Sequence, residues 1–487
     1  MISVAEDRRL DRGSILFHLA LVGMCATTGI AAAVKPALGI ELALGLAAVV
    51  FVMTSVFAGL VLFTLVSFLE VASLNNSALS AMKAIGLVLF LSWLLRATAG
   101  RRGEIASLLR SHRPILLAGA AFVAWSALSA LWAQSPGVAG SSTLRYLENF
   151  LLLPIVLSTV TRRKHVVWIA AAFVVGGLAA ALYGFASPQP VSSRDFGRLT
   201  ATNLDANGLA LALAVAVTFA AALLATARGR PLLRWSLALS IGFGLVGIFA
   251  TQSRSGVISL VTMLVAAALF GGRWRRHAVV VLILAATAGG VYLAVAPPTS
   301  TSHVTSSDTA GRTDLWTVAL RMFDSHPMVG VGSGNFPVSS VDYVSRPGDI
   351  TRADLIVDTP LATHNVYLQL LAEVGIPGLL AFVSLFVVAA GSALRAAARF
   401  ARARQTELGL LARYYVCVLA GLAASDFFLP NQFLKQFWLL IALGPALLAI
   451  ARRGSAGPRP VRSRAATPAR TFTAGRRSPA HVSLGDA

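Results

Sequence analysis

Long apolar runs recur along almost the whole chain and are separated by short polar segments. Runs of about twenty apolar residues occur from Ile15 to Ile450, and a helix of that length spans a hydrocarbon core of roughly 30 Å. A helix satisfies its own backbone hydrogen bonds, which lipid cannot do. The pattern therefore predicts an all-α fold, a polytopic transmembrane helix bundle.

The positions of Arg and Lys indicate how these helices are oriented. After an N-terminal segment with three arginines, five basic loops alternate with loops of low charge: Arg96 to Arg113, Arg162 to Lys164, Arg228 to Arg234, Arg273 to Arg276 and Arg395 to Arg413. The positive-inside rule places all of them in the cytoplasm. The stretch Ile40 to Leu69 must then cross twice, as a pair of short helices. We expect about 12–14 transmembrane helices, with both termini inside.

The chain divides into five segments on this pattern. A tail with eight arginines and one acidic residue shows no apolar periodicity, so it cannot form a core and should be disordered. The segments are a cytoplasmic N-terminus (1–14), an N-terminal transmembrane bundle (15–296), a large outer loop (297–374), C-terminal transmembrane helices (375–451) and a disordered basic cytoplasmic tail (452–487).

Composition agrees with a chain that folds in lipid. Hydrophobic residues make up 56% of it and charged residues only 13%, far from the balance of a soluble protein. A net charge of +21 would suggest nucleic-acid binding in a soluble protein, but here the charge lies in short loops and the tail, so we expect no nucleic acid partner. Cys25 and Cys417 both lie inside apolar runs, which indicates neither a disulfide framework nor a thiolate metal site.

The large outer loop is the longest polar segment between two expected helices. Loops of this length are usually functional or disordered. Thr313 to Asp324 places Leu315, Val318 and Met322 at helical spacing, so we expect the loop to be ordered.

Arginine on the outer side of the membrane needs an explanation, because the positive-inside rule disfavours it. The large loop carries Arg312, and a short outer turn carries Arg254. A guanidinium holds phosphate oxygens bidentately, so these arginines could bind a diphosphate headgroup. The alternative is that they contact lipid headgroups or pair with acidic neighbours.

His364 lies where the large loop turns into a membrane helix. A neutral imidazole at that position can accept a proton from an alcohol near pH 7, as a general base does. The alternative, a structural histidine at a helix start, is favoured by the spacing alone. Asn203, Asp205 and Asn207 have two interpretations as well, as polar residues that cap the next helix or as residues that bind a sugar.

The segments around these residues resemble the signature region of the O-antigen ligase and polymerase family. The resemblance is carried, in chain order, by Asn203 to Gly208, Ser253 to Gly256, Gly311 to Trp316, His326-Pro327, Gly330 to Pro337 and His364 to Gly378.

The resemblance implies an enzyme of the bacterial inner membrane that transfers a glycan from an undecaprenyl diphosphate carrier to an acceptor hydroxyl on the periplasmic face. It implies no metal ion and no other cofactor. His364 would be the general base, Arg254 and Arg312 would bind the diphosphate, and Asn365 and Asn207 are further candidates for substrate binding. The expected partners are the lipid-linked glycan donor, a glycan or lipid A-core acceptor, and membrane lipids.

Three other classes of protein were compared with this interpretation. A transporter or flippase should show internal repeats and polar breaks near the bilayer midplane, and the sequence has neither. A metal-dependent transferase with an acidic pair in its first outer loop would need two carboxylates, but Lys35 to Glu41 offers one. A non-catalytic scaffold would tolerate loss of His364. Within the enzyme class, ligase, polymerase and protein O-glycosylation stay open.

Overall fold

The structure is a computed structural model of the 487-residue chain. It describes residues 36–68, 81–99, 104–188, 197–201 and 204–272, parts of 275–290, and then 311–345, 350, 353–358 and 361–455. In these ranges every regular element is a helix, and a single isolated bridge joins Ala201 to Leu204. The all-α fold is confirmed.

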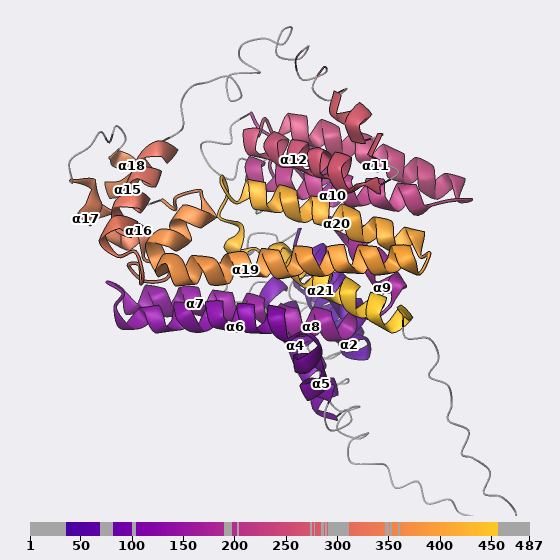
Figure 1. Ribbon diagram of the computed structural model, residues 1–487, viewed down its shortest axis with the longest axis horizontal. Helices are drawn as coiled ribbons and strands as arrows, with labels where there is room; N and C mark the ends of the chain where they lie inside the picture. Colours follow the sequence, from indigo (N-terminus) through magenta and orange to yellow (C-terminus); the bar gives the residue numbers. More distant parts are fainter. Residues whose placement is uncertain are drawn as a thin grey trace, which may run out of the picture.

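Most helices run side by side in one bundle (Figure 1). In the part of the chain that the structure describes, eight are long and apolar enough to cross a membrane: α4 (Ala81–Ala99), α6 (Arg113–Leu128, extended by a 3-10 turn), α9 (Arg163–Ala186), α10 (Ala206–Thr226), α11 (Pro231–Ala250), α19 (Val366–Arg402), α20 (Thr406–Ser425) and α21 (Lys435–Ser455).

Further helices belong to this multi-pass bundle: α2 (Pro36–Thr54), α3 (Val56–Val66), α7 (Pro136–Phe150), α8 (Leu152–Thr159) and α12 (Arg254–Phe270). The expected helix at 15–34 lies outside the described residues, and the one near 277–296 lies partly outside them. The total of 12–14 helices therefore stays a prediction.

The stretch expected to cross twice is divided into two helices at Ser55, whose hydroxyl accepts a hydrogen bond from the Ala58 amide and so caps α3. The junction lies beside two basic loops: Arg96 donates to the carbonyl oxygens of the last residues of α2, and the Phe57 ring stacks on His165 at 4.0 Å between centroids. A turn at the basic side is what two crossings require.

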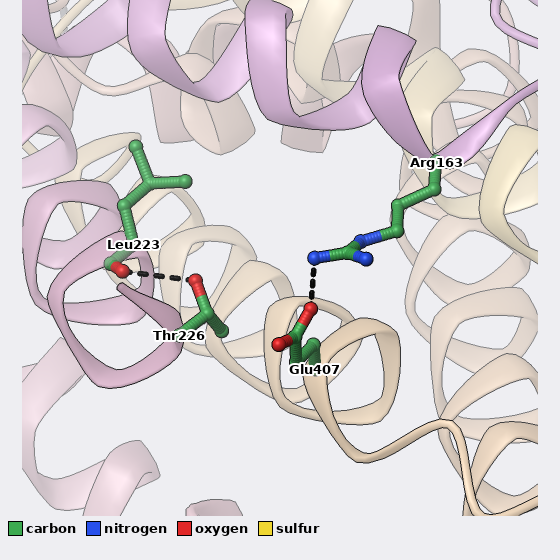
Figure 2. Close-up of polar contacts among 4 residues, drawn as sticks. All are labelled: Arg163, Leu223, Thr226 and Glu407. Carbon is green, nitrogen blue, oxygen red and sulfur yellow. Dashed lines mark hydrogen bonds and ion pairs between the residues drawn. The ribbon is translucent and has the colours of Figure 1, made fainter. Parts of the chain in front are cut away.

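The loops predicted to be cytoplasmic meet at one end of the bundle. Arg163 at the start of α9 forms an ion pair with Glu407 at the start of α20 (Figure 2). Arg413 donates to the carbonyl oxygen of Phe270, the last residue of α12, at 3.1 Å. Basic segments far apart in the sequence therefore share one face, as the positive-inside rule predicts.

The same end includes the first residues of the expected tail. α21 continues to Ser455, so Arg452 and Arg453, expected in the tail, are helical. Both lie near His112, which precedes α6. Burial, and to a smaller extent the charges of Arg452 and Arg453, lower the pKa of His112 to about 4. His112 is therefore neutral near pH 7. Residues 456–487 lie outside the described part of the chain.

The described part of the large loop folds into helices at the opposite end of the bundle (Figure 1). They are α15 (Arg312–Ser325), α16 (Phe336–Ser339), α17 (Val341–Val344) and α18 (Asp354–Val357). The predicted amphipathic helix is confirmed in α15, which buries its apolar face in a small core separate from that of the bundle: Leu315, Val318, Ala319, Met322, Val331, Phe336, Tyr343, Ile356 and Ala372.

The two ends should be accessible from opposite sides of the membrane. Ser345 is exposed at the loop end and Ala403 at the basic end. In a background with Cys25 and Cys417 replaced, we expect a membrane-impermeant thiol reagent added to intact cells to label Ser345→Cys, and to label Ala403→Cys only after lysis. The reverse pattern would invert the orientation.

Candidate functional site

His364 lies in a tight turn just before α19. Its φ of 52° is in the left-handed region, where a non-glycine residue stays only when its surroundings hold it. Asn365 caps the helix by accepting from the Leu368 amide at 3.1 Å, and the Thr363 hydroxyl donates to the Asn365 carbonyl oxygen at 2.8 Å. The Val366 amide donates to the backbone carbonyl oxygen of Asp426, at the end of α20, at 2.8 Å. The half-buried imidazole is thus carried by a fixed segment.

Arg312 lies close to this turn, although it is 52 positions before His364 in the sequence. The indole Nε1 of Trp316 donates to the carbonyl oxygen of Thr363 at 3.0 Å. Arg312 is the first residue of α15 and so lies about one helical turn from Trp316. The structure therefore brings the start of α15 and the His364 turn together.

Arg254 and Asn207 belong to a second group of polar residues at the same end. Arg254 is exposed and begins α12. The Ser253 hydroxyl before it donates to Asn207 Oδ1 at 2.7 Å and also accepts from the Gly256 amide as the helix cap. The cap of α10 is Asp205, whose carboxylate accepts from the Gly208 amide at 2.7 Å. Asn207 is therefore not the capping residue.

Arg198 joins this second group and was not singled out from the sequence. Its Nη2 donates to Asn207 Oδ1 at 3.1 Å and its Nε donates to the Thr251 carbonyl oxygen at 2.9 Å. The signal was available, because Arg198 lies in another outer loop where the positive-inside rule disfavours arginine.

The two groups are connected through α20. This helix packs against α10 and α12, whose first residues carry Asn207 and Arg254, and also against α19. Its last turn contacts the start of α19 through Asp426 and Val366. All five residues proposed from the sequence therefore lie at the end of the bundle opposite the basic loops.

The part of the chain that carries these residues is similar to known proteins. Residues 237–383 fit the family model described as O-antigen ligase, a range that includes Arg254, Arg312 and His364. Residues 237–383 are therefore similar to the O-antigen ligase family. An O-antigen ligase of Pseudomonas aeruginosa is 28% identical to the chain over 348 residues, which are 69% of this chain and 77% of that protein. The family resemblance seen in the sequence is confirmed.

Asp426 is a buried carboxyl group at the end of α20. Its side chain is fully buried, and its Oδ1 accepts from the side-chain Nδ2 of Asn431 at 2.7 Å. Its Oδ2 has no hydrogen-bond partner among the described residues. Burial raises the pKa of Asp426 well above its ordinary range, so the fold favours the neutral carboxyl.

This pKa shift predicts how stability depends on pH. Because the folded-state pKa of Asp426 is above the unfolded value, its stabilising contribution is complete at low pH and is lost as the pH rises from 3.8 through the raised pKa, by about 1.4 kcal/mol per pH unit. We expect Asp426→Asn, which is neutral at every pH and keeps the acceptor for Asn431, to flatten the profile of melting temperature against pH. The exposed Asp342→Asn is the control. Parallel profiles for Asp426→Asn and wild type would refute this.

Proposed function

We propose that this protein transfers a glycan from undecaprenyl diphosphate to an acceptor hydroxyl at the periplasmic face of the inner membrane, without a metal ion. The observation that carries the proposal is the Trp316–Thr363 hydrogen bond. It connects the helix that begins at Arg312 to the turn that holds His364. Both lie at the end of the bundle opposite the basic loops.

The arginines are assigned to the diphosphate. When the bond between the anomeric carbon and the diphosphate breaks, its electron pair and negative charge remain on the leaving group. Arg254 and Arg312 are the first residues of α12 and α15, so their backbones are already fixed before the reaction. Fixed cationic donors stabilise such a charge without reorganising. Arg198 is already used by Asn207 and Thr251, so we assign it to holding the second polar group together.

His364 is assigned to the acceptor. The hydroxyl oxygen attacks the anomeric carbon, its proton passes to the neutral imidazole, and the diphosphate departs. One direct displacement inverts the anomeric carbon. The Asn365 side-chain oxygen accepts from the Leu368 amide, so any contact of Asn365 with substrate would use its amide NH₂ group. Asn207 accepts from Arg198 and Ser253 through its side-chain oxygen, so any contact of Asn207 with substrate would also use its amide NH₂ group.

Within the enzyme class we favour a ligase that hands the glycan to lipid A core. The similarity to a Pseudomonas aeruginosa O-antigen ligase over most of both chains supports this choice. A polymerase that joins repeat units, each on its own carrier lipid, uses the same groups and differs in the acceptor.

The test is complementation of a deletion strain with His364→Ala, Arg254→Ala and Arg312→Ala, each at equal membrane expression. We expect each substitution to lower glycan transfer about 100-fold or more, the usual effect of losing a general base or a charge-stabilising donor. The control is Arg276→Ala, an exposed arginine at the basic end.

The glycan left behind identifies the acceptor. Full-length chains stranded on the carrier lipid indicate a lost ligase, and single repeat units on the surface indicate a lost polymerase. Wild-type transfer by all three variants would instead support the transporter or scaffold alternatives.

A further inference from the structure

Glu373 is a fully buried carboxylate on α19 with no part in the reaction described above. Its Oε2 accepts from the Gly334 amide at 2.7 Å. Its Oε1 accepts from the Gln369 side-chain amide at 3.0 Å and from the Phe336 amide at 3.4 Å. Both oxygens are therefore held by donors, two of which belong to the turn that follows α15 in the large loop.

The carboxylate continues a polar face that begins beside His364. Asn365, Gln369 and Glu373 are four residues apart, so they lie on one side of the helix, and all three are buried. The turn that carries the imidazole and the carboxylate that holds the loop are therefore parts of one rigid element.

The turn that follows α15 contains Gly330, Gly332 and Gly334. Its backbone also pairs with the backbone of α19 where that helix is interrupted. Gly375 has a φ of 64° and a ψ of −168°, which is not helical. Beside it, the Gly332 amide donates to the Glu373 carbonyl oxygen at 2.8 Å and the Ile376 amide donates to the Pro327 carbonyl oxygen at 3.0 Å. Side chain and backbone of Glu373 thus fasten the same turn.

These contacts fix one end of α15, and another contact fixes the other end. α15 ends at Ser325, directly before the turn held by Glu373. Near its start, Trp316 donates to Thr363. The direction of α15 against the bundle is set by these two attachments, and Arg312 is its first residue.

We propose that Glu373 is a positioning residue that sets the direction of α15 and, through it, the place of Arg312 relative to His364. The consequence for catalysis rests on the proposed function. Glu373 is buried and does not touch the substrate. A carboxylate is required because it offers acceptors on both oxygens, whereas a glutamine has one oxygen and would bring its NH₂ group against a backbone donor.

The first experiment measures geometry without catalysis. Spin labels at Thr313→Cys on α15 and Leu144→Cys on α7, both exposed positions, report the distance from α15 to the bundle in protein with Cys25 and Cys417 replaced. We expect Glu373→Gln to shift or broaden the distribution of this distance. The matched control is Glu407→Gln, which removes the carboxylate paired with Arg163 at the other end and should leave the distribution unchanged.

The second experiment measures kinetics on the purified protein with a lipid-diphosphate glycan donor, per folded molecule. Glu373→Gln should raise the donor KM and lower kcat together, with a loss in kcat/KM of at least tenfold, and Glu407→Gln should stay within twofold. If Glu373→Gln does not fold, Gln369→Leu removes one of the three donors and should move both readouts in the same direction by less.

The outcomes separate the two proposals. A changed distance together with changed kinetics supports the positioning role. A changed distance in a protein whose wild type transfers no glycan supports the positioning of α15 and rejects the proposed function. An unchanged distance, with any loss of activity explained by a smaller amount of folded protein, overturns the role of Glu373.

Discussion

In lipid, a backbone polar group without a partner costs several kcal/mol, and α19 leaves its regular helical path at Gly375. The carbonyl groups near this break are satisfied by other segments: Trp125 on α6 donates to Val374 at 2.8 Å, and Gly332 donates to Glu373. The requirement to satisfy this backbone attaches the large loop to the bundle. Together with the Trp316–Thr363 hydrogen bond, that attachment fixes α15 and Arg312 relative to His364.

Basic residues differ in their placement at the two ends of the bundle. At one end, Arg163 pairs with Glu407 and the basic loops meet. At the other end, Arg254 begins a helix and Arg198 is hydrogen-bonded within a loop. Arginine in such places suits a ligand that is itself anionic and lies at the membrane surface. A diphosphate carrier lipid has this chemistry.

Much of the fold follows from local patterns. Apolar runs and the alternation of basic loops predict the bundle and its basic end, and the spacing of Leu315, Val318 and Met322 predicts α15. Local spacing does not show which distant segments meet. The Trp316–Thr363 hydrogen bond spans 47 residues and the Gly334–Glu373 bond spans 39, so the neighbourhood of His364 and the use of Glu373 emerge only from tertiary packing. Asp205, and not Asn207 two positions later, caps α10; propensity does not choose between these two polar residues.

The most direct test of the account is a cryo-EM structure of the full chain in lipid nanodiscs with undecaprenyl diphosphate. We expect diphosphate density in contact with Arg254 and Arg312, with the His364 imidazole facing the same space at the periplasmic face of the membrane. A diphosphate bound elsewhere, or any one of these three residues more than about 15 Å from the other two, beyond the reach of contact chemistry, would contradict it.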